Sequence, residues 1–211
     1  MDDLQKLLDN NARWAAKAIE QDPDFFARLT RQQRPDYLWI GCSDSRVPAN
    51  EIVDLLPGEL FVHRNVANVV PHSDLNCQSV IQFAVDVLKV KHIMVVGHYG
   101  CSGVHAALHE SRVGLADHWL GHVRDVASLH RPLLDAQATP ARRASLLCEL
   151  NVLEQAINVC SSMAVTDAWA RGQQLSVHGW IYELHAGRLR DLEVTVASVD
   201  EADELHKRAA G

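Results

Sequence analysis

Short runs rich in apolar residues alternate with amphipathic stretches along this chain. The apolar runs occupy 37–41, 60–64 and 93–96, and turns of small and polar residues follow the first and the third. Between the second and third runs, residues 75–89 keep the apolar spacing of a helix. This strand–helix–strand order predicts a parallel sheet whose strands are buried.

The second half of the chain continues with helices and two further strands. Helices are predicted over 103–109, 115–130 and 140–172. The last of them is expected to end at Gly172, because glycine readily adopts the left-handed conformation of a helix end. Residues 176–182 predict a fourth strand, and the alternation in 192–196 predicts a half-exposed, antiparallel edge strand.

The two ends of the chain are predicted to be helical. Residues 1–33 predict two helices with an incomplete apolar stripe, an arm that lies on its own sheet or embraces a partner subunit. Residues 200–211 predict a polar tail in a loose helix. The expected fold class is therefore α/β, with a mostly parallel β-sheet, an antiparallel edge strand, flanking helices and an N-terminal helical arm. One domain is expected to span 1–211.

Charge and length narrow the possible partners and compartments. The formal net charge of -7 over 211 residues argues against nucleic acid as a partner, because phosphate binding needs clustered basic residues. The apolar runs all fall short of the roughly 18 residues that a membrane span needs. The acidic N-terminus also lacks the basic start and apolar stretch of a signal peptide. We therefore expect a soluble, cytoplasmic protein with no membrane partner.

Two of the five cysteines stand apart from the others. An odd number of cysteines without a secretion signal does not suit a disulfide framework. Cys77, Cys148 and Cys160 lie in helical apolar patterns, which predicts buried thiols. Cys42 and Cys101 instead follow the first and third predicted strands, in turns that contain glycine.

Cys42, His98 and Cys101 are predicted to meet at one edge of the sheet, because parallel strands end along the same edge. Two thiolates and an imidazole are ligands that zinc prefers, and a catalytic zinc keeps a fourth position open. The alternative is that His98 pairs with a backbone carbonyl while both thiols are simply buried. A phosphate-binding loop is disfavoured, since the glycines at 97, 100 and 103 fit neither a dinucleotide-binding nor a P-loop pattern.

Asp44 and Arg46 are two residues apart, so an extended turn points both side chains the same way. The guanidinium can hold the carboxylate in one orientation and keep it ionised. The pair is interpreted either as a local ion pair that stabilises the turn or as an oriented acceptor for the proton of a bound hydroxide. Asp44 could also become a fourth zinc ligand and close the site.

Three short motifs carry a resemblance to a known family. They are Cys42-Ser43-Asp44-Ser45-Arg46-Val47, Phe61-Val62-His63-Arg64-Asn65-Val66-Ala67-Asn68 and Gly97-His98-Tyr99-Gly100-Cys101. Together they resemble a β-class carbonic anhydrase. The similarity to bacterial members extends over nearly the whole chain, through Cys148-Glu149-Leu150-Asn151-Val152 and His178-Gly179-Trp180. The resemblance implies that Cys42, His98 and Cys101 hold Zn2+. It also implies that Asp44 and Arg46 form the catalytic dyad.

The resemblance further implies an activity, a substrate pocket and an assembly. The activity is the reversible hydration of CO2 to bicarbonate and a proton by a zinc-bound hydroxide. Val47 and Gly103 would line an apolar pocket for CO2, and Phe83 and Val87 would be contributed across a dimer interface. A dimer, or a tetramer built from dimers, is expected on the same grounds.

A further resemblance concerns regulation. Trp39, Arg64 and Tyr182 match a trio that binds bicarbonate at a non-catalytic site in one bacterial subgroup. In that subgroup, bicarbonate or low pH favours a closed state in which the aspartate matching Asp44 ligates zinc. The residues by themselves also fit an aromatic pair packed at strand ends, with Arg64 in an ordinary ion pair.

Two other functions remain open at this point, and one residue departs from the family. A relative with the same zinc site could hydrolyse another small molecule such as CS2, and a non-catalytic zinc or bicarbonate sensor would keep the three ligands. The presence of both Asp44 and Arg46 favours catalysis over a sensor. Many family members have glycine where this chain has Ser102, whose hydroxyl could narrow the cleft or donate to a bound anion.

Overall fold

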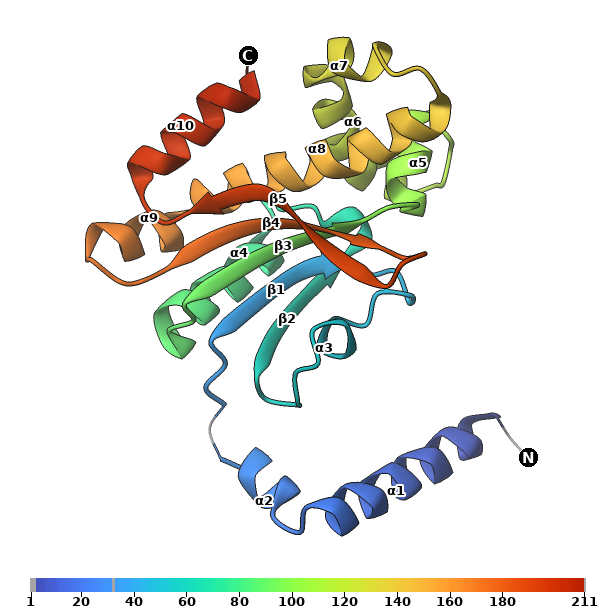
Figure 1. Cartoon of the computed structure of the whole chain (residues 1–211), viewed down its shortest axis with the longest axis vertical. Helices are drawn as coiled ribbons and strands as arrows, with labels where there is room; N and C mark the ends of the chain where they lie inside the picture. The colour runs from blue at the N-terminus through green and yellow to red at the C-terminus, as the bar shows by residue number, and fades with distance from the viewer. Residues whose placement is uncertain (1–2, 32, 211) are drawn as a thin grey trace. The chain divides into compact units, whose positions relative to one another are not determined.

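Residues 35–211 are built on one five-stranded sheet (Figure 1). The computed structural model describes residues 3–31 and 33–210, and the chain divides into two compact units, residues 1–34 and residues 35–211. The strands are β1 (Tyr37–Cys42), β2 (Leu60–Asn65), β3 (His92–His98), β4 (Ser176–Glu183) and β5 (Arg188–Val196). Their order across the sheet is β2-β1-β3-β4-β5. β1 to β4 run parallel and β5 pairs antiparallel with β4, so the predicted fold class is confirmed.

Helices connect the strands and follow them. They are α3 (Ala49–Ile52), α4 (Leu75–Gln82), α5 (Ser102–Leu108), α6 (Ala116–Leu129), α7 (Arg131–Asp135), α8 (Pro140–Cys160), α9 (Met163–Ala170) and α10 (Val199–Ala210). A 3-10 turn, η1 (Val66–Asn68), follows β2, and a π-helical stretch, η2 (Phe83–Leu88), continues α4. Side-chain caps start two of these helices, α4 and α8. The Asp74 carboxylate accepts a hydrogen bond at the start of α4, and the Thr139 hydroxyl does so for α8.

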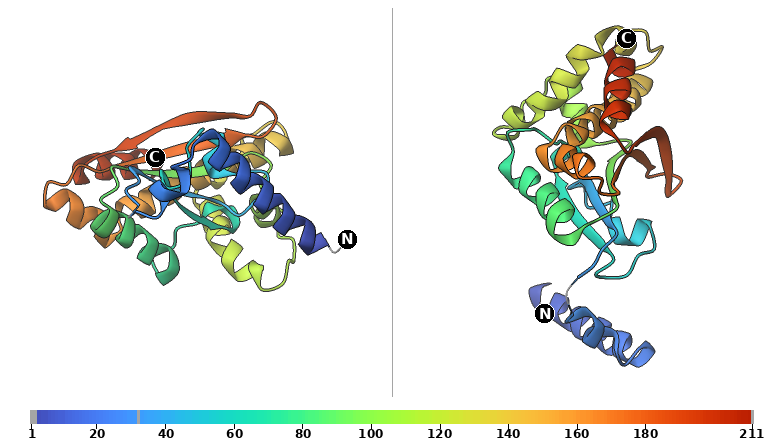
Figure 2. Two further views of the ribbon diagram at one scale, coloured as in Figure 1. Left: turned by 90° about the horizontal axis from the view of Figure 1, so that it is seen from below. Right: turned by 90° about the vertical axis from the view of Figure 1, so that its left-hand side faces the viewer.

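The two faces of the sheet are covered unequally. On one face, side chains of β1, β3 and β4 pack with α4, α5, α6, α8, α9 and α10 in one large apolar core, and Figure 2 shows this layer of helices. On the other face, a smaller cluster surrounds Trp39, Met94 and Val96, with α3 packed against it. Neighbouring residues of a strand point to opposite faces, so Leu38 and Ile40 enter the large core while Trp39 enters the smaller cluster.

Two predicted helices are interrupted in the structure. The stretch 140–172 is divided into α8 and α9, because Ser162 adopts an extended conformation between them (φ -70°, ψ 142°). The stretch 75–89 begins as α4 and continues as the π-helical η2 until Lys89, which is left-handed (φ 58°) and ends it. The edge strand begins at Arg188 rather than at residue 192. Apolar spacing continues across such breaks, so the pattern alone does not locate them.

The first unit consists of α1 (Asp3–Gln21) and α2 (Phe25–Leu29). Trp14 packs edge-on against Phe25 and Phe26, with ring centroids 6.2 and 5.7 Å apart. None of the described residues of α1 is buried, and its large apolar side chains are exposed: Leu4, Leu7, Leu8, Trp14 and Ile19. Among all helices in residues 3–31 and 33–210, none is long and apolar enough to cross a membrane.

Candidate metal centre

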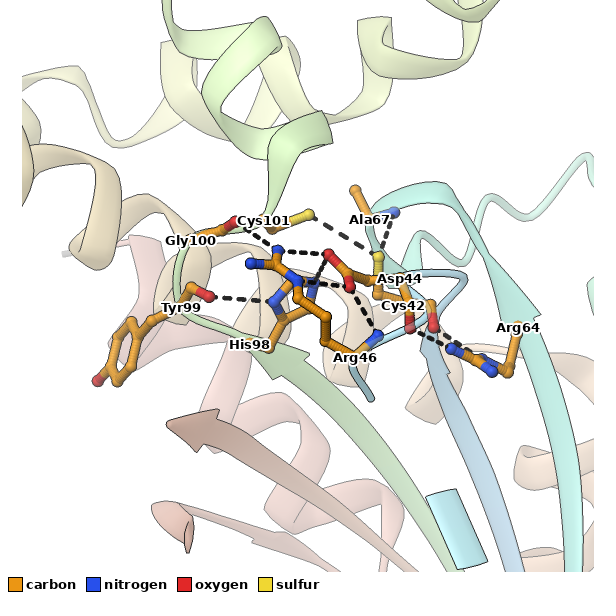
Figure 3. A network of polar contacts seen from close by, with 9 residues as sticks. All are labelled: Cys42, Asp44, Arg46, Arg64, Ala67, His98, Tyr99, Gly100 and Cys101. Carbon is orange, nitrogen blue, oxygen red and sulfur yellow. Dashed lines mark hydrogen bonds and ion pairs between the residues drawn. The ribbon is translucent and has the colours of Figure 1, made fainter. Parts of the chain in front are cut away.

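The three predicted ligands meet at the carboxyl edge of the sheet (Figure 3). Cys42 is the last residue of β1, His98 is the last residue of β3, and Cys101 is the N-cap of α5. β1 and β3 are parallel neighbours, so their ends deliver the first two side chains side by side. All three side chains are buried, and their ligand atoms lie within 4.8 Å of one another.

The spacing of the two sulfurs suits a tetrahedral metal. Cys42 Sγ and Cys101 Sγ are 3.8 Å apart. Two sulfurs bound tetrahedrally to zinc, each at about 2.3 Å, are separated by about 3.8 Å. The two thiols are therefore already at the separation that a zinc ion requires.

His98 turns an unprotonated ring nitrogen toward the sulfurs of Cys42 and Cys101. Its Nδ1 lies 3.0 Å from the carbonyl oxygen of Tyr99, and a carbonyl only accepts hydrogen bonds, so Nδ1 carries the proton. Nε2 is buried and has no hydrogen-bond partner among the described residues. Asp44 Oδ2 lies 3.7 Å from it, too far for a hydrogen bond. A buried lone pair fits a metal ion, and the Tyr99 carbonyl fixes the tautomer that offers it.

The two thiols share a hydrogen bond that favours a thiolate at Cys42. Either sulfur can be the donor in this contact, and an S–H on Cys101 facing Cys42 lowers the pKa of Cys42 to about 4 in spite of its burial. The same hydrogen bond, together with burial, raises the pKa of Cys101 well above its ordinary value. The backbone N–H of Ala67 also donates to Cys42 Sγ, at 3.4 Å. Because metals bind the thiolate, these contacts prepare Cys42 as a ligand.

Asp44 and Arg46 form a two-pronged ion pair beside the ligands. Arg46 Nε donates to Asp44 Oδ1 at 2.9 Å, and Nη2 donates to Oδ2 at 2.7 Å. These hydrogen bonds hold the pKa of the Asp44 carboxyl well below its usual range, so the group stays ionised. Arg46 Nη2 also donates to the carbonyl oxygen of Gly100 at 3.3 Å and links the loops that follow β1 and β3. The carboxylate is thus paired with Arg46 rather than placed among the ligands.

The predicted pocket residues fall in three places. Gly103 is buried in α5, two residues after Cys101, and a Cβ on it would lie 3.0 Å from Val66. Val47 is buried in the smaller apolar cluster with Trp39, three residues after Asp44. Phe83 and Val87 are exposed on η2, on the surface of the single chain. Residues that complete a pocket in a partner subunit would have this exposure before assembly.

Ser102 lies at the rim of a cavity beside the centre. The cavity has a volume of about 340 Å³ and is lined by Gly100, Cys101, Ser102, Val104, His105, Ala144 and Cys148. Ser102 is exposed, so its hydroxyl is available to solvent and to an ion in this cavity.

Trp39 and Tyr182 share the smaller apolar cluster on the other face of the sheet. Trp39 is fully buried, and its Nε1 lacks a hydrogen-bond partner within the described residues. Its indole folds over Gly41, where a Cβ would lie 2.2 Å from Nε1. A side chain at position 41 would therefore displace the indole.

Arg64 connects this face to the loop that carries the dyad. It is exposed, and it donates to the carbonyl oxygen of Cys42 at 2.8 Å and to that of Asp44. Across residues 3–31 and 33–210, its partners are backbone carbonyls, so the ordinary ion pair considered for Arg64 is not formed.

A second group of ligand-type side chains, His63, Asp74 and Cys77, lies where β2 meets α4. Asn65 Oδ1 accepts a hydrogen bond from the Val69 N–H at 2.8 Å, and Asn65 Nδ2 donates to the Val69 carbonyl oxygen at 2.7 Å. These two bonds fix the orientation of the Asn65 amide, and its nitrogen also lies 3.2 Å from His63 Nε2. His63 Nε2 therefore accepts a hydrogen bond and is not free for a metal. Burial raises the pKa of the Cys77 thiol to about 12. In this group neither His63 Nε2 nor the Cys77 thiol is prepared as a metal ligand in the way that Cys42 is.

Two backbone groups complete the centre, and side-chain patterns do not predict either of them. The Tyr99 carbonyl fixes His98, and the Ala67 N–H reaches Cys42 from η1. Every residue carries a carbonyl, and all but proline carry an N–H, so residue type gives almost no signal for such roles.

Comparisons with known proteins cover the whole of this fold. A sequence profile described as "Carbonic anhydrase" matches residues 37–189. The chain is 48% identical to a carbonic anhydrase of Emericella nidulans over 189 residues, which are 90% of this chain and 83% of the relative. A Coccomyxa β-carbonic anhydrase in complex with acetazolamide has a TM-score of 0.91 and 38% identity, covering 99% of this chain and 96% of that one. A tetrameric β-carbonic anhydrase of Sordaria macrospora has a TM-score of 0.88 and 38% identity, covering 93% and 100%.

The fold is that of an α/β protein, and the two thiols and the imidazole at its sheet edge could hold a tetrahedral metal. The profile matches well over half of the chain, and the chain belongs to the β-class carbonic anhydrase family. The prediction of an enzyme of this family is confirmed. Membership of the bacterial subgroup with a non-catalytic bicarbonate site stays a prediction, because these comparisons do not separate the subgroups.

Proposed function

We propose that this chain catalyses the reversible hydration of CO2 to bicarbonate and a proton, with Zn2+ held by Cys42, His98 and Cys101. The observation that carries the proposal is the buried Nε2 of His98, which has no hydrogen-bond partner in the described part of the chain and lies beside two sulfurs spaced for a tetrahedral ion. The carbonic anhydrases that the chain matches support it. Zinc, when bound, lowers the pKa of a coordinated water to about 7 and so provides a nucleophile at neutral pH.

Asp44 and Arg46 are proposed to orient the attacking water. Arg46 holds both carboxylate oxygens of Asp44, so the carboxylate accepts the water's hydrogen bond from one direction. Its depressed pKa keeps Asp44 an acceptor throughout the neutral range. A carboxyl with so low a pKa does not keep a proton at neutral pH, so the released proton must pass on to buffer.

CO2 is proposed to bind in an apolar pocket at the carboxyl edge of the sheet, beside the metal centre. Val47 and Gly103 bring buried apolar surface to the loops that carry the ligands. Phe83 and Val87 are proposed to complete the pocket from a partner subunit, which agrees with their exposure in one chain. An apolar lining suits a substrate without charge or dipole, because it excludes competing water.

Stopped-flow measurement of CO2 hydration tests this function. The zinc-loaded wild-type protein should hydrate CO2 well above the buffer rate. Cys42→Ser should lose both zinc and activity, because it removes one of the two thiolate ligands. Cys160→Ser is the matched control, since Cys160 is a buried thiol of α8 outside the centre, and it should retain both. Wild-type protein with stoichiometric zinc and no rate above buffer would overturn the proposal and favour a sensor or a hydrolase of CS2.

We also propose that bicarbonate, or low pH, inhibits the enzyme through Trp39, Arg64 and Tyr182. The buried Trp39 Nε1 is a donor in need of an acceptor, and Arg64 donates to the carbonyl oxygen of Asp44. An anion that draws Arg64 toward Trp39 would weaken the hold of Arg64 on the Asp44 loop. Asp44 could then leave Arg46 and join the ligands as a closing group.

The pH dependence of the rate tests this regulation. From about pH 6.5 to about pH 9, the rate should rise steeply, and added bicarbonate should suppress it at the lower end. Tyr182→Phe should weaken the suppression because it removes a donor. Tyr37→Phe, which changes a tyrosine stacked on His92 of the same sheet, should not. A rate that follows a single-proton titration with pH and does not change with added bicarbonate would contradict the proposed regulation. The proposed CO2 hydration activity would still stand.

The assembly is proposed to be a dimer or a tetramer. The exposed apolar stripe of α1 and the exposed Phe83 and Val87 supply surfaces for self-association. A similar protein, that of Sordaria macrospora, is tetrameric. We propose that the arm (1–33), the sheet unit and the tail (200–211) act as one domain, located in the cytoplasm.

A further inference from the structure

Helix α8 is hydrogen-bonded to the turn beside Cys42 through the buried side chain of Asn151. Asn151 is 1% exposed, and its Nδ2 donates to the carbonyl oxygen of Ala67 at 2.8 Å. Its Oδ1 accepts a hydrogen bond from Gln155 Nε2 at 3.2 Å. Gln155 is itself oriented, because its Oε1 accepts from the Val70 N–H at 2.7 Å. This chain of hydrogen bonds determines which end of the Asn151 amide faces Ala67.

Ala67 has an unusual backbone conformation at the end of that hydrogen bond. Its φ is 64° and its ψ is 28°, the left-handed region that alanine rarely adopts, and Asn68 follows with φ 46°. The N–H of the same Ala67 donates to Cys42 Sγ at 3.4 Å (Figure 3). The left-handed turn therefore aims the N–H at the sulfur, and Asn151 holds the carbonyl on the other side of the same residue.

We propose that Asn151 is a positioning residue for the Cys42 thiolate and acts through Ala67. This role rests on the proposed zinc centre. Without the Asn151 donor, the buried Ala67 carbonyl would lack a partner, and the strained turn at 66–68 would relax toward ordinary conformations. The Ala67 N–H would then move away from the sulfur. A thiolate that loses this hydrogen bond is less well oriented, which weakens metal binding, and its sulfur lone pairs rise in energy, which changes the spectrum of the bound metal.

The alternative is that the Asn151–Ala67 hydrogen bond only holds α8 against η1. Its loss would then lower the free energy of unfolding and leave the electron density on Cys42 Sγ unchanged. In Co2+-loaded protein, the sulfur-to-cobalt charge-transfer band reports that density directly. Loss of an N–H donor raises the energy of the sulfur lone pairs and moves the band to longer wavelength.

The test compares two variants of α8. Asn151→Leu has nearly the same size and no donor, whereas Ile157→Ala opens a cavity at a buried position of the same helix that does not contact the centre. Asn151→Leu should bind Zn2+ about 10- to 100-fold more weakly in competition with a chelator. Its cobalt charge-transfer band should also shift to longer wavelength. Ile157→Ala should melt at a lower temperature and keep the wild-type affinity and band.

A folded Asn151→Leu protein with wild-type zinc affinity and an unshifted cobalt band would overturn the proposal. A measurement on the wild type remains decisive if this variant does not fold. In cadmium-113-loaded wild-type protein, the Ala67 amide proton should show scalar coupling to the metal across the N–H···S hydrogen bond. Absence of that coupling would also overturn the proposal. A wild type that binds none of Zn2+, Co2+ and Cd2+ would instead contradict the metal centre itself.

Discussion

The Arg46 guanidinium is the main group that lowers the pKa of Asp44. The hydrogen bond from Arg46 is the main cause that lowers the pKa of Asp44 below its ordinary value of 3.8, against the opposing effect of burial. Because the folded-state pKa lies below the unfolded one, the pair stabilises the fold above about pH 4. The stabilisation is lost as the pH falls through the folded-state pKa. The Arg46 side chain is 54% exposed, so solvent screens the pair and keeps this contribution small.

At the residue scale, we predict that Arg46→Gln raises the pKa of Asp44 toward 3.8. NMR titration of the Asp44 carboxyl carbon in metal-free protein measures the change. Arg28→Gln is the matched control, because Arg28 forms an exposed ion pair with Asp22 in the first unit. This control should leave the titration of Asp44 as it is in the wild type. Identical titration of Asp44 in the wild type and in Arg46→Gln would contradict the role given to Arg46.

At the scale of elements, α8 is held to its neighbouring helices by contacts of different burial. His130, which follows α6, lies 2.7 Å from Glu154 of α8, and their side chains are 4% and 14% exposed. Arg143 of α8 lies 3.2 Å from Asp135 of α7, and these side chains are 39% and 58% exposed. A buried group that loses its partner cannot recover a hydrogen bond from water, whereas an exposed one can.

We therefore predict unequal effects from two matched substitutions. Glu154→Ala should lower the free energy of unfolding by about 1–3 kcal/mol, because it leaves the buried His130 ring without its partner. Asp135→Ala should lower it by less than about 1 kcal/mol, because Arg143 returns to water. Urea denaturation at neutral pH measures both. Equal effects would show that burial does not govern these contacts.

At the scale of the whole molecule, α1 presents an apolar surface that one chain does not bury. None of its described residues is buried, and five large apolar side chains are exposed along it. A fully buried leucine side chain contributes about 1.5–3 kcal/mol through the hydrophobic effect. Burial of this stripe in a partner subunit is the proposed driving force for assembly.

Leu7→Glu should therefore weaken self-association by on the order of 10-fold or more, because it places a charge in the apolar stripe. Sedimentation velocity over a range of concentrations measures the shift toward smaller species. Ala16→Glu is the control, since it adds the same charge to the same helix at an exposed position without a large apolar side chain. Equal weakening by the two variants would indicate that net charge, rather than the stripe, controls assembly.

Much of the fold follows from local patterns. Strand cores such as Leu38 to Ile40 and Ile93 to Val96 are recognisable because burial on both faces requires continuous apolar residues. The helix break at Ser162 and the π-helical stretch that ends at Lys89 are not recognisable in this way. Both depend on how a segment meets its neighbours rather than on its own periodicity.

The candidate metal centre also has features that local sequence predicts and features that depend on packing. The sequence alone determined the candidate ligands, Cys42, His98 and Cys101, and their place at the ends of parallel strands, because side-chain chemistry and strand direction are local properties. The tertiary structure alone decided that His98 Nε2 has no hydrogen-bond partner among the described residues, that Arg64 contacts carbonyls and that Asn151 reaches Ala67. These contacts join segments far apart in the chain or depend on the direction of a single backbone group. Residue spacing does not encode such directions, because they are set only when the helices pack on the sheet.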